Sequence, residues 1–134
     1  MTHLLDTNIC IRLIKRKPES LIRRLSGLAV DDVAISCITV AELQYGAYKS
    51  RYPDTNRAAL LQFLLPFTLL DFDQSAAREY GKVRAELESR GAPIGATDML
   101  IAAHARSQAL TVVTNSVREF QRVDRLNIEN WLEA

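Results

Sequence analysis

The sequence contains few of the residues that build metal cages or disulfide frameworks. Its 134 residues include only two cysteines, Cys10 and Cys37, and two histidines, His3 and His104. These four residues do not follow zinc-finger spacing, which argues against structural zinc. Both cysteines stand in apolar surroundings and we recognise no secretory leader, so we expect buried thiols rather than a disulfide.

Long apolar runs and a strong net charge are also missing. The apolar segments are far shorter than the roughly 20 residues that a membrane helix needs, so we expect no membrane partner. A formal net charge of +1 does not by itself indicate a nucleic-acid-binding protein. The sequence lacks glycine-rich phosphate loops and the nucleophile elbow of serine hydrolases. A composition of 48% hydrophobic and 25% charged residues is typical of one globular domain, which we expect to span residues 1–134.

Short apolar segments alternate with amphipathic segments along the chain. We expect strands at these positions: 3–5, 33–36, 68–70, 110–113 and, at an edge, 126–128. Helical periodicity predicts helices between them, one opening near Thr39 and one over 98–109 with Thr97 as its N-cap. The alternation predicts an α/β domain with a short, mainly parallel central sheet of four to five strands flanked by helices.

Acidic residues stand where predicted strands pass into helices. Asp6 follows the first strand, Glu42 lies early in the helix after the second, and Asp98 opens an apolar helix. Asn115 and Glu119 follow the strand at 110–113. Because the carboxyl ends of parallel strands share one edge of the sheet, we expect these side chains to converge there.

Converging carboxylates would repel one another unless a cation neutralised them, so the pattern indicates a metal ion. Ligation by oxygen alone favours Mg²⁺ or Mn²⁺. A metal held by carboxylates can activate water and stabilise a leaving oxygen, which makes hydrolysis of a phosphodiester the chemistry that we expect.

Each residue also has an ordinary structural interpretation. Asp6 alone would cap a helix, Asp98 would be a first-turn acid and Glu42 a solvated helix residue. Their coincidence at strand ends favours the functional interpretation. His104, on an apolar helix, is interpreted as a core histidine rather than a base. Three tyrosines are interpreted as packing or partner-facing residues: Tyr45, Tyr48 and Tyr52.

Basic residues are concentrated between Arg12 and Arg24, with Glu19 as the only acidic residue among them. Such a patch can bind phosphates although the whole chain is nearly neutral, and a solvated helix face is the alternative. We predict that three of its members contact RNA phosphate: Lys15, Arg16 and Lys17.

Four motifs stand in order along the chain. They are LLDTN at 4–8, ITVAEL at 38–43 followed by Gly46, PIG at 93–95 leading to Asp98 and IAAHA at 101–105, and VTN at 113–115 followed by REF at 118–120. Over essentially the whole chain, this series resembles the VapC toxins of bacterial VapBC toxin–antitoxin modules, which are PIN-domain ribonucleases.

The resemblance implies a PIN-like fold and a cytoplasmic endoribonuclease that depends on Mg²⁺ or Mn²⁺. Such a toxin cuts tRNA or other structured RNA, inhibits translation and is neutralised by a VapB-like antitoxin. A homodimer within a larger toxin–antitoxin complex is also implied.

The resemblance also assigns roles to single residues. The catalytic and metal-binding set corresponds to Asp6, Glu42 and Asp98, with Thr7 and Asn115 in support. Many PIN domains have a fourth acid directly after the fourth strand, where this chain has Asn115 and Ser116. Glu119 is the nearest carboxylate, and we expect it to complete the site in a supporting role.

Two other functions stay open on the sequence alone. One is a PIN-like RNA-binding or scaffold module without turnover, although retention of all three acids argues against it. The other is a metal-dependent phosphatase or DNA nuclease, because a fold does not fix the substrate.

Overall fold

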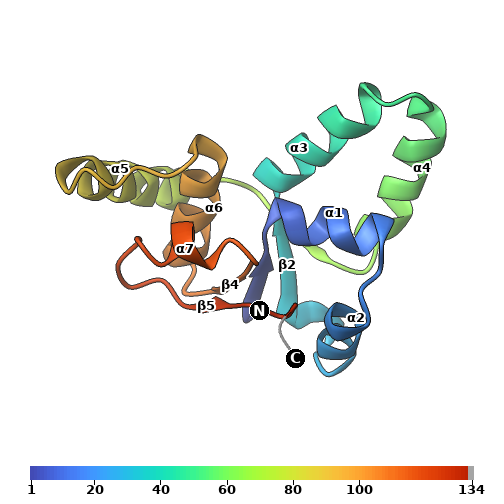
Figure 1. Cartoon of the computed structure of the whole chain (residues 1–134), viewed down its shortest axis with the longest axis horizontal. Helices are drawn as coiled ribbons and strands as arrows, with labels where there is room; N and C mark the ends of the chain where they lie inside the picture. Colours follow the sequence, from blue (N-terminus) through green and yellow to red (C-terminus); the bar gives the residue numbers. More distant parts are fainter. Residues whose placement is uncertain (133–134) are drawn as a thin grey trace.

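A computed structural model describes residues 1–132 of the chain, in which strands alternate with helices as predicted (Figure 1). Residues 133–134 of the predicted single domain lie outside the described residues. The strands are β1 (His3–Leu5), β2 (Val33–Ser36), β3 (Thr68–Leu70), β4 (Thr111–Val113) and β5 (Ile128–Glu129). The helices are α1 (Thr7–Lys15), α2 (Glu19–Ser26), α3 (Cys37–Tyr48), α4 (Pro53–Leu64), α5 (Gln74–Ser89), α6 (Ala96–Ser107) and α7 (Val117–Phe120), with a 3₁₀ turn at Val30–Asp32.

The five strands form one parallel sheet in the order β3-β2-β1-β4-β5. This confirms the predicted α/β class and the short central sheet. The chain places β2 on one side of β1 and β4 on the other, with Leu4 of β1 aligned with both Ala34 and Val112. The chain segments that follow β1 and β4 therefore lead to opposite sides of the sheet. In parallel sheets, ligands bind at the carboxyl ends of two strands that are related in this way.

Alternate residues of the strands face two separate apolar cores. Leu4 and Val112 belong to the core beneath α5, α6 and α7, whereas Leu5 and Val113 belong to the core beneath α1 to α4. Figure 1 shows these two groups of helices on opposite sides of the sheet. The result is a layer of helices on each face of the strands, as expected where both faces of a parallel sheet are buried.

Side-chain caps start three of the helices just after a strand or an extended segment. Asp6, Ser36 and Asp73 accept backbone N–H groups of the first turns of α1, α3 and α5. The prediction that Thr97 caps α6 is wrong, because the helix begins at Ala96 and Gly95 is its N-cap. Helix α3 begins at Cys37 instead of near Thr39, because the Ser36 hydroxyl already satisfies the Ile38 amide.

Two further expectations are corrected. The edge strand lies at Ile128–Glu129 rather than 126–128, because its register is set by pairing with Val112 and Val113. Cys10 is fully buried as predicted, but Cys37 is only partly buried, and its thiol donates to Asp71 at 3.4 Å. Neither cysteine is in a disulfide. Within residues 1–132, no helix is long and apolar enough to cross a membrane.

Candidate active site

Asp6 lies at the carboxyl end of β1 and is only 3% exposed. Its Oδ1 accepts the Ile9 amide at 2.8 Å, so the capping interpretation of this residue is correct. Capping does not compensate its charge, however, since the pKa of Asp6 is raised to about 6, mainly by burial and also by the nearby charge of Asp98. Hydrogen bonds from Thr114 and the Ile9 amide, and the charge of Arg12, act in the opposite direction. Asp6 is therefore a buried carboxylate whose charged form is only partly stabilised.

Asp98 and Glu119 extend this acidic site. Asp98 stands in the first turn of α6, as predicted, and is half-buried. Burial raises its pKa, and the charge of Glu119 on α7 raises it further. Within residues 1–132, neither Asp98 nor Glu119 has an ion-pair partner. The structure therefore brings Asp98 within electrostatic range of both Asp6 and Glu119, and the charge of Arg12 offsets the raised pKa of Asp6 only in part.

The donors at this site suit a magnesium ion in kind. Carboxylate oxygens are the ligands that Mg²⁺ and Mn²⁺ prefer, and mutual repulsion between Asp6 and Asp98 favours a cation between them. No group of three or more potential ligands within residues 1–132 is arranged tightly enough to form a metal cage. Mg²⁺ does not need one, because it is usually bound by one or two carboxylates and keeps several waters. Asp6 and Asp98 are the residues that could hold such an ion.

Glu42 is not among the residues whose charge raises the pKa of Asp6 or Asp98. It is exposed on α3 and lines a cavity of about 460 Å³ together with Thr7. Thr7 adjoins Asp6 in sequence, and its hydroxyl is 3.1 Å from the hydroxyl of Thr39 on α3. Glu42 is one helical turn beyond Thr39, on the same side of α3. The structure thus places Glu42 beside the mouth of the site, and its role as a ligand stays a prediction.

Thr114 and Asn115 follow β4 on the same edge of the sheet. The buried Thr114 hydroxyl bonds to Asp6 and also accepts the Ser116 amide at 2.8 Å. Asn115 Oδ1 is buried and has no hydrogen-bond partner among residues 1–132. Sequence reasoning selected Asn115 but missed Thr114, although Thr114 belongs to the VTN motif at 113–115. Arg12 was also missed as a neighbour of Asp6; its position two turns into the helix that Asp6 caps was the available signal.

His104 is a core residue, as predicted. It is fully buried, and its Nδ1 is 2.8 Å from the hydroxyl of Ser36, the residue that caps α3. Burial lowers the pKa of His104, which keeps the ring neutral. The residue links α6, which carries Asp98, to the start of α3, which carries Glu42.

The predicted basic contacts divide into two groups. Lys15 and Arg16 line a second cavity beside Asn115, whereas Lys17 lies past the end of α1, with a positive φ of 45°, and does not line that cavity.

The three tyrosines that were interpreted as packing or partner-facing residues are all exposed, by 62% for Tyr45, 58% for Tyr48 and 61% for Tyr52.

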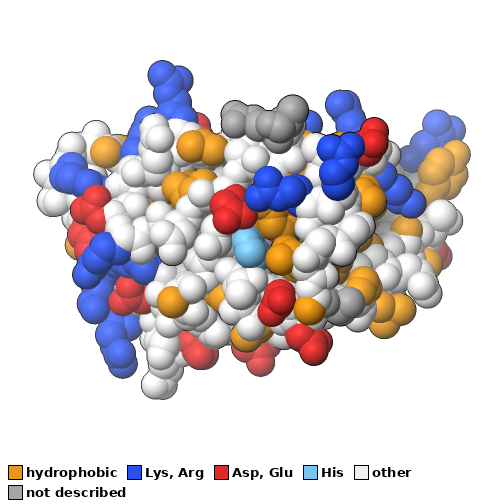
Figure 2. Space-filling model, turned by 90° about the horizontal axis from the view of Figure 1, so that it is seen from below, with side chains coloured by type: hydrophobic (Ala, Val, Ile, Leu, Met, Phe, Trp, Pro, Cys, Tyr) orange, Lys and Arg blue, Asp and Glu red, His pale blue; other side chains and the backbone are white. Residues whose placement is uncertain are grey.

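The opposite edge of the sheet carries a different arrangement of charge. Figure 2 shows this face, where basic and acidic side chains are interspersed. His3 and Arg24 both approach Glu129, at 3.1 and 3.4 Å. The charges of this cluster are paired, in contrast to the acids at the carboxyl edge.

Comparison with known proteins gives a consistent picture. A sequence model of the PIN domain matches residues 3–126. The chain is 46% identical to "Ribonuclease VapC2" of Haemophilus influenzae over 132 residues, which cover 98% of this chain and 99% of that protein. It is 47% identical to "tRNA(fMet)-specific endonuclease VapC" of Shigella flexneri, with 96% of each chain covered.

A solved structure shares the fold over nearly its whole length. The crystal structure of DNA-bound VapBC from Salmonella typhimurium superposes with a TM-score of 0.94 and 44% identity, covering 98% of both chains. The similarity therefore includes the strands, the helices and the edge of the sheet at which the acids lie.

Proposed function

This chain belongs to the PIN-domain family, and we propose that it is a Mg²⁺-dependent endoribonuclease that acts as the toxin of a type II toxin–antitoxin pair. Ribonuclease activity follows from near-full-length similarity to VapC ribonucleases. Metal dependence is supported by a group of acids near the carboxyl ends of β1 and β4: Asp6, Asp98 and Glu119. Burial and neighbouring acids raise the pKa values of Asp6 and Asp98, and a cation would favour their charged forms.

The chain's own residues would prepare a site for phosphodiester hydrolysis. A bound Mg²⁺ ion supplies Lewis-acid activation of water and neutralises charge on the phosphate. Asp6 and Asp98 would hold the ion, and the bonds of Asp6 to Ile9 and Thr114 fix the carboxylate in place. Glu119 adds negative charge next to Asp98, which strengthens the attraction for a cation, and Glu42 would approach from α3.

We propose tRNA or another structured RNA as the substrate, on the basis of the tRNA-specific relative. A DNA nuclease or phosphatase on this scaffold would share the metal site, so the nucleic acid must be tested directly. The module without turnover is disfavoured, because a binding protein gains nothing from a buried carboxylate whose pKa is raised by burial and by a second acid.

We propose that a VapB-like antitoxin is the protein partner of this chain. We also propose that the toxin forms a homodimer and that the pair acts in the cytoplasm. The cavity of about 460 Å³ beside Glu42 has an apolar wall that includes Ile14, Leu43 and Leu60, and Tyr45 lies at its rim. Such a wall suits an apolar segment of a partner chain. The VapBC complex similar to this chain supports that assignment.

The deciding experiment is cleavage of initiator tRNA and of a DNA of the same sequence, with Mg²⁺ or Mn²⁺ and with EDTA. Asp6→Asn and Asp98→Asn should each abolish metal-dependent cleavage of the RNA. Asp73→Asn is the matched control, because Asp73 caps α5 through the Ala76 amide just as Asp6 caps α1, yet it lies outside the site. Equal cleavage by all four proteins would indicate a contaminating nuclease and contradict the assignment. Cleavage of the DNA alone would support the DNA nuclease.

A further inference from the structure

A second cavity of about 440 Å³ lies beside Asp6, between α1 and the turn after β4. Its lining residues are Asn8, Ile11, Arg12, Lys15, Arg16, Asn115 and Ser116. Arg12 influences the charge of Asp6, so the cavity and the acidic site are neighbours.

The three cations of this cavity have no acidic partner within residues 1–132. No carboxylate of this part of the chain lies within 4.0 Å of Arg12, Lys15 or Arg16. Their spacing of three and four residues places all three on one side of α1. The next arginines along the chain differ, because Arg23 pairs with Glu19 and Arg24 with Glu129.

Uncharged hydrogen-bonding groups complete the lining. Asn8 and Asn115 contribute amides and Ser116 a hydroxyl, groups whose N–H and O–H can donate to a phosphate. Arginine and lysine around a polar hollow bind phosphate well, with arginine able to bind two oxygens at once. A peptide carboxylate is the other anion to consider. Ile11 is the only large apolar residue in this lining, whereas the cavity beside Glu42 has an apolar wall. The lining therefore favours a nucleic-acid phosphate over an apolar peptide.

We propose that this cavity binds a backbone phosphate of the RNA strand next to the bond that is cut, with Arg12 and Arg16 as its principal contacts. The proposal rests on the proposed function and goes beyond it by defining a substrate-positioning subsite. The proposal also changes the set of residues predicted from the sequence to contact RNA phosphate. It adds Arg12 and removes Lys17, which does not line the cavity.

The test is binding of a fluorescent single-stranded RNA in EDTA, where metal-dependent cleavage is excluded, over a series of KCl concentrations. Arg12→Gln/Arg16→Gln should weaken binding about tenfold at low salt and reduce the slope of log K against log salt by about 0.7, the value for one lost phosphate contact on a single strand. Arg23→Gln/Arg78→Gln removes the same charge from exposed positions outside the cavity and should change neither quantity by a comparable amount.

RNA cleavage kinetics and antitoxin binding distinguish a phosphate subsite from a site for the protein partner. The single variant Arg16→Gln should raise KM for RNA cleavage and leave kcat unchanged, because it removes binding energy shared by substrate and transition state. Loss of binding in the double variant, in a protein that cuts nothing, would support the phosphate subsite while contradicting the proposed function. RNA binding equal to that of the control variant would overturn the subsite. Selective loss of antitoxin binding would also overturn it, since the cavity would then serve the protein partner.

Discussion

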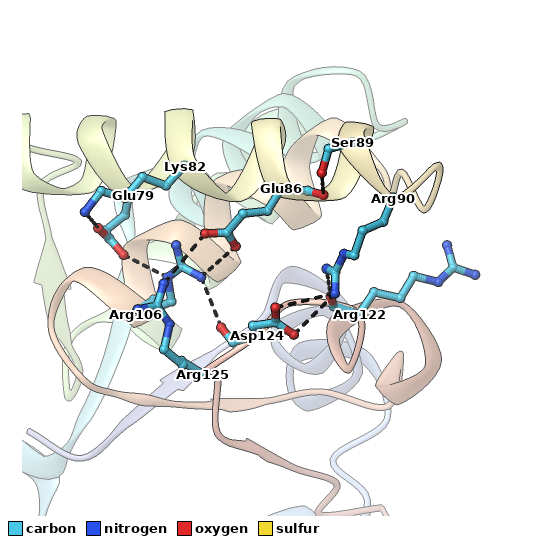
Figure 3. A network of polar contacts seen from close by, with 9 residues as sticks. All are labelled: Glu79, Lys82, Glu86, Ser89, Arg90, Arg106, Arg122, Asp124 and Arg125. Atoms are coloured by element: carbon cyan, nitrogen blue, oxygen red, sulfur yellow. Dashed lines mark hydrogen bonds and ion pairs between the residues drawn. The ribbon is translucent and has the colours of Figure 1, made fainter.

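The two ends of helix α6 use charged residues in opposite ways. At its C-terminal end, Arg106 is 6% exposed and bonds to Glu79 at 2.8 Å, to Glu86 at 3.3 Å and to the Asp124 carbonyl at 3.0 Å. Figure 3 shows this network joining α5 to α6 and to the loop after α7, where Arg90 contacts Asp124. At its N-terminal end, Asp98 is half-buried beside Glu119 and has no basic partner within residues 1–132.

The paired charge of Arg106 holds parts of the fold together, whereas the charge of Asp98, unpaired within residues 1–132, is available to a ligand. A buried arginine with several acceptors fixes neighbouring elements, and it is available to no ligand. Burial and acidic neighbours disfavour the charged forms of Asp6 and Asp98 when no ligand is bound, which leaves a strong interaction for a metal ion. The cations on α1 form no ion pair within residues 1–132 and can interact with a phosphate. Substitutions at the two ends should therefore change different properties.

The largest effect should come from Asp98→Asn. We expect RNA cleavage to fall by more than about 100-fold, because loss of a metal ligand should exceed the 10- to 100-fold cost typical of groups that only orient ligands. The free energy of unfolding in EDTA should stay equal or increase, since the charged form of Asp98 is disfavoured by burial and by Glu119. Parallel cleavage assays and urea denaturation would test this pair of outcomes. A large decrease in the unfolding free energy of Asp98→Asn would show that Asp98 stabilises the fold. The two ends of α6 would then not differ in the role of their charged residues.

The second effect is a pH dependence of stability due to Asp6. Its pKa of about 6 in the folded protein exceeds the ordinary value of 3.8, so the folded state holds this proton more tightly than the unfolded state. The stabilisation by protonated Asp6 is therefore full below pH 4, decreases as the pH rises to about 6 and is absent above it. The difference in unfolding free energy between the native chain and Asp6→Asn should change by about 3 kcal/mol across this range in EDTA. A flat difference would mean that Asp6 is fully compensated.

Comparison with Asp6→Asn is needed because other acids titrate in the opposite sense. Arg106 holds the pKa of Glu79 below its usual value, so its stabilisation is lost as the pH falls through that lowered pKa. Asn remains a good N-cap, so the variant removes the charge of Asp6 without removing its capping function. Added Mg²⁺ should stabilise the native chain at neutral pH and have a weaker effect on Asp6→Asn.

At the other end of α6, Arg106→Met should destabilise the fold by about 2 kcal/mol, because it leaves partly buried carboxylates without their shared partner. Cleavage by the folded fraction should stay close to that of the native chain. Arg84→Gln is the matched control on α5, because it breaks the exposed pair with Glu88 at 3.2 Å and should cause no measurable loss. Urea denaturation measures both variants. Unchanged stability in Arg106→Met would contradict the structural role of the network.

Much of this fold could be predicted from local signals in the sequence. The strands Val33–Ser36 and Thr68–Leu70 were predicted at their observed bounds because short β-branched or apolar runs end at polar residues or proline. The start of α6 was missed because Thr97 is a better cap by propensity than Gly95, and tertiary packing decides between them. The register of β5 was missed because it depends on β4, which is distant in sequence.

The candidate site was predictable only where topology determines it. Asp6 follows from the rule that parallel strands end at one edge, because it directly follows β1. Asp98 was expected at the end of a strand, but α6 follows α5, and it is the packing of α6 that brings Asp98 near Asp6. The bond of Thr114 to Asp6 and the approach of Arg12 to it depend on how side chains meet across elements, which periodicity does not encode. For the same reason, the cavity that Glu42 shares with Thr7 could not be foreseen, since a position early in α3 fixes the helix but not the surroundings of the carboxylate.

The smallest predicted effect concerns the link between the two regions. Ser36 caps α3 through the Ile38 amide at 3.1 Å and bonds at 2.8 Å to Nδ1 of His104, which lies in the last turn of α6. Ser36→Ala should lower the unfolding free energy by about 1 kcal/mol or slightly more, because it removes a cap and leaves a buried ring nitrogen unpaired. Ser26→Ala is the control, since Ser26 bonds only to the Ile22 carbonyl at the exposed end of α2. If Ser36→Ala instead reduced cleavage strongly at unchanged stability, the Ser36–His104 contact would position the acids of α3 and α6, and the last turn of α6 would have a functional as well as a structural role.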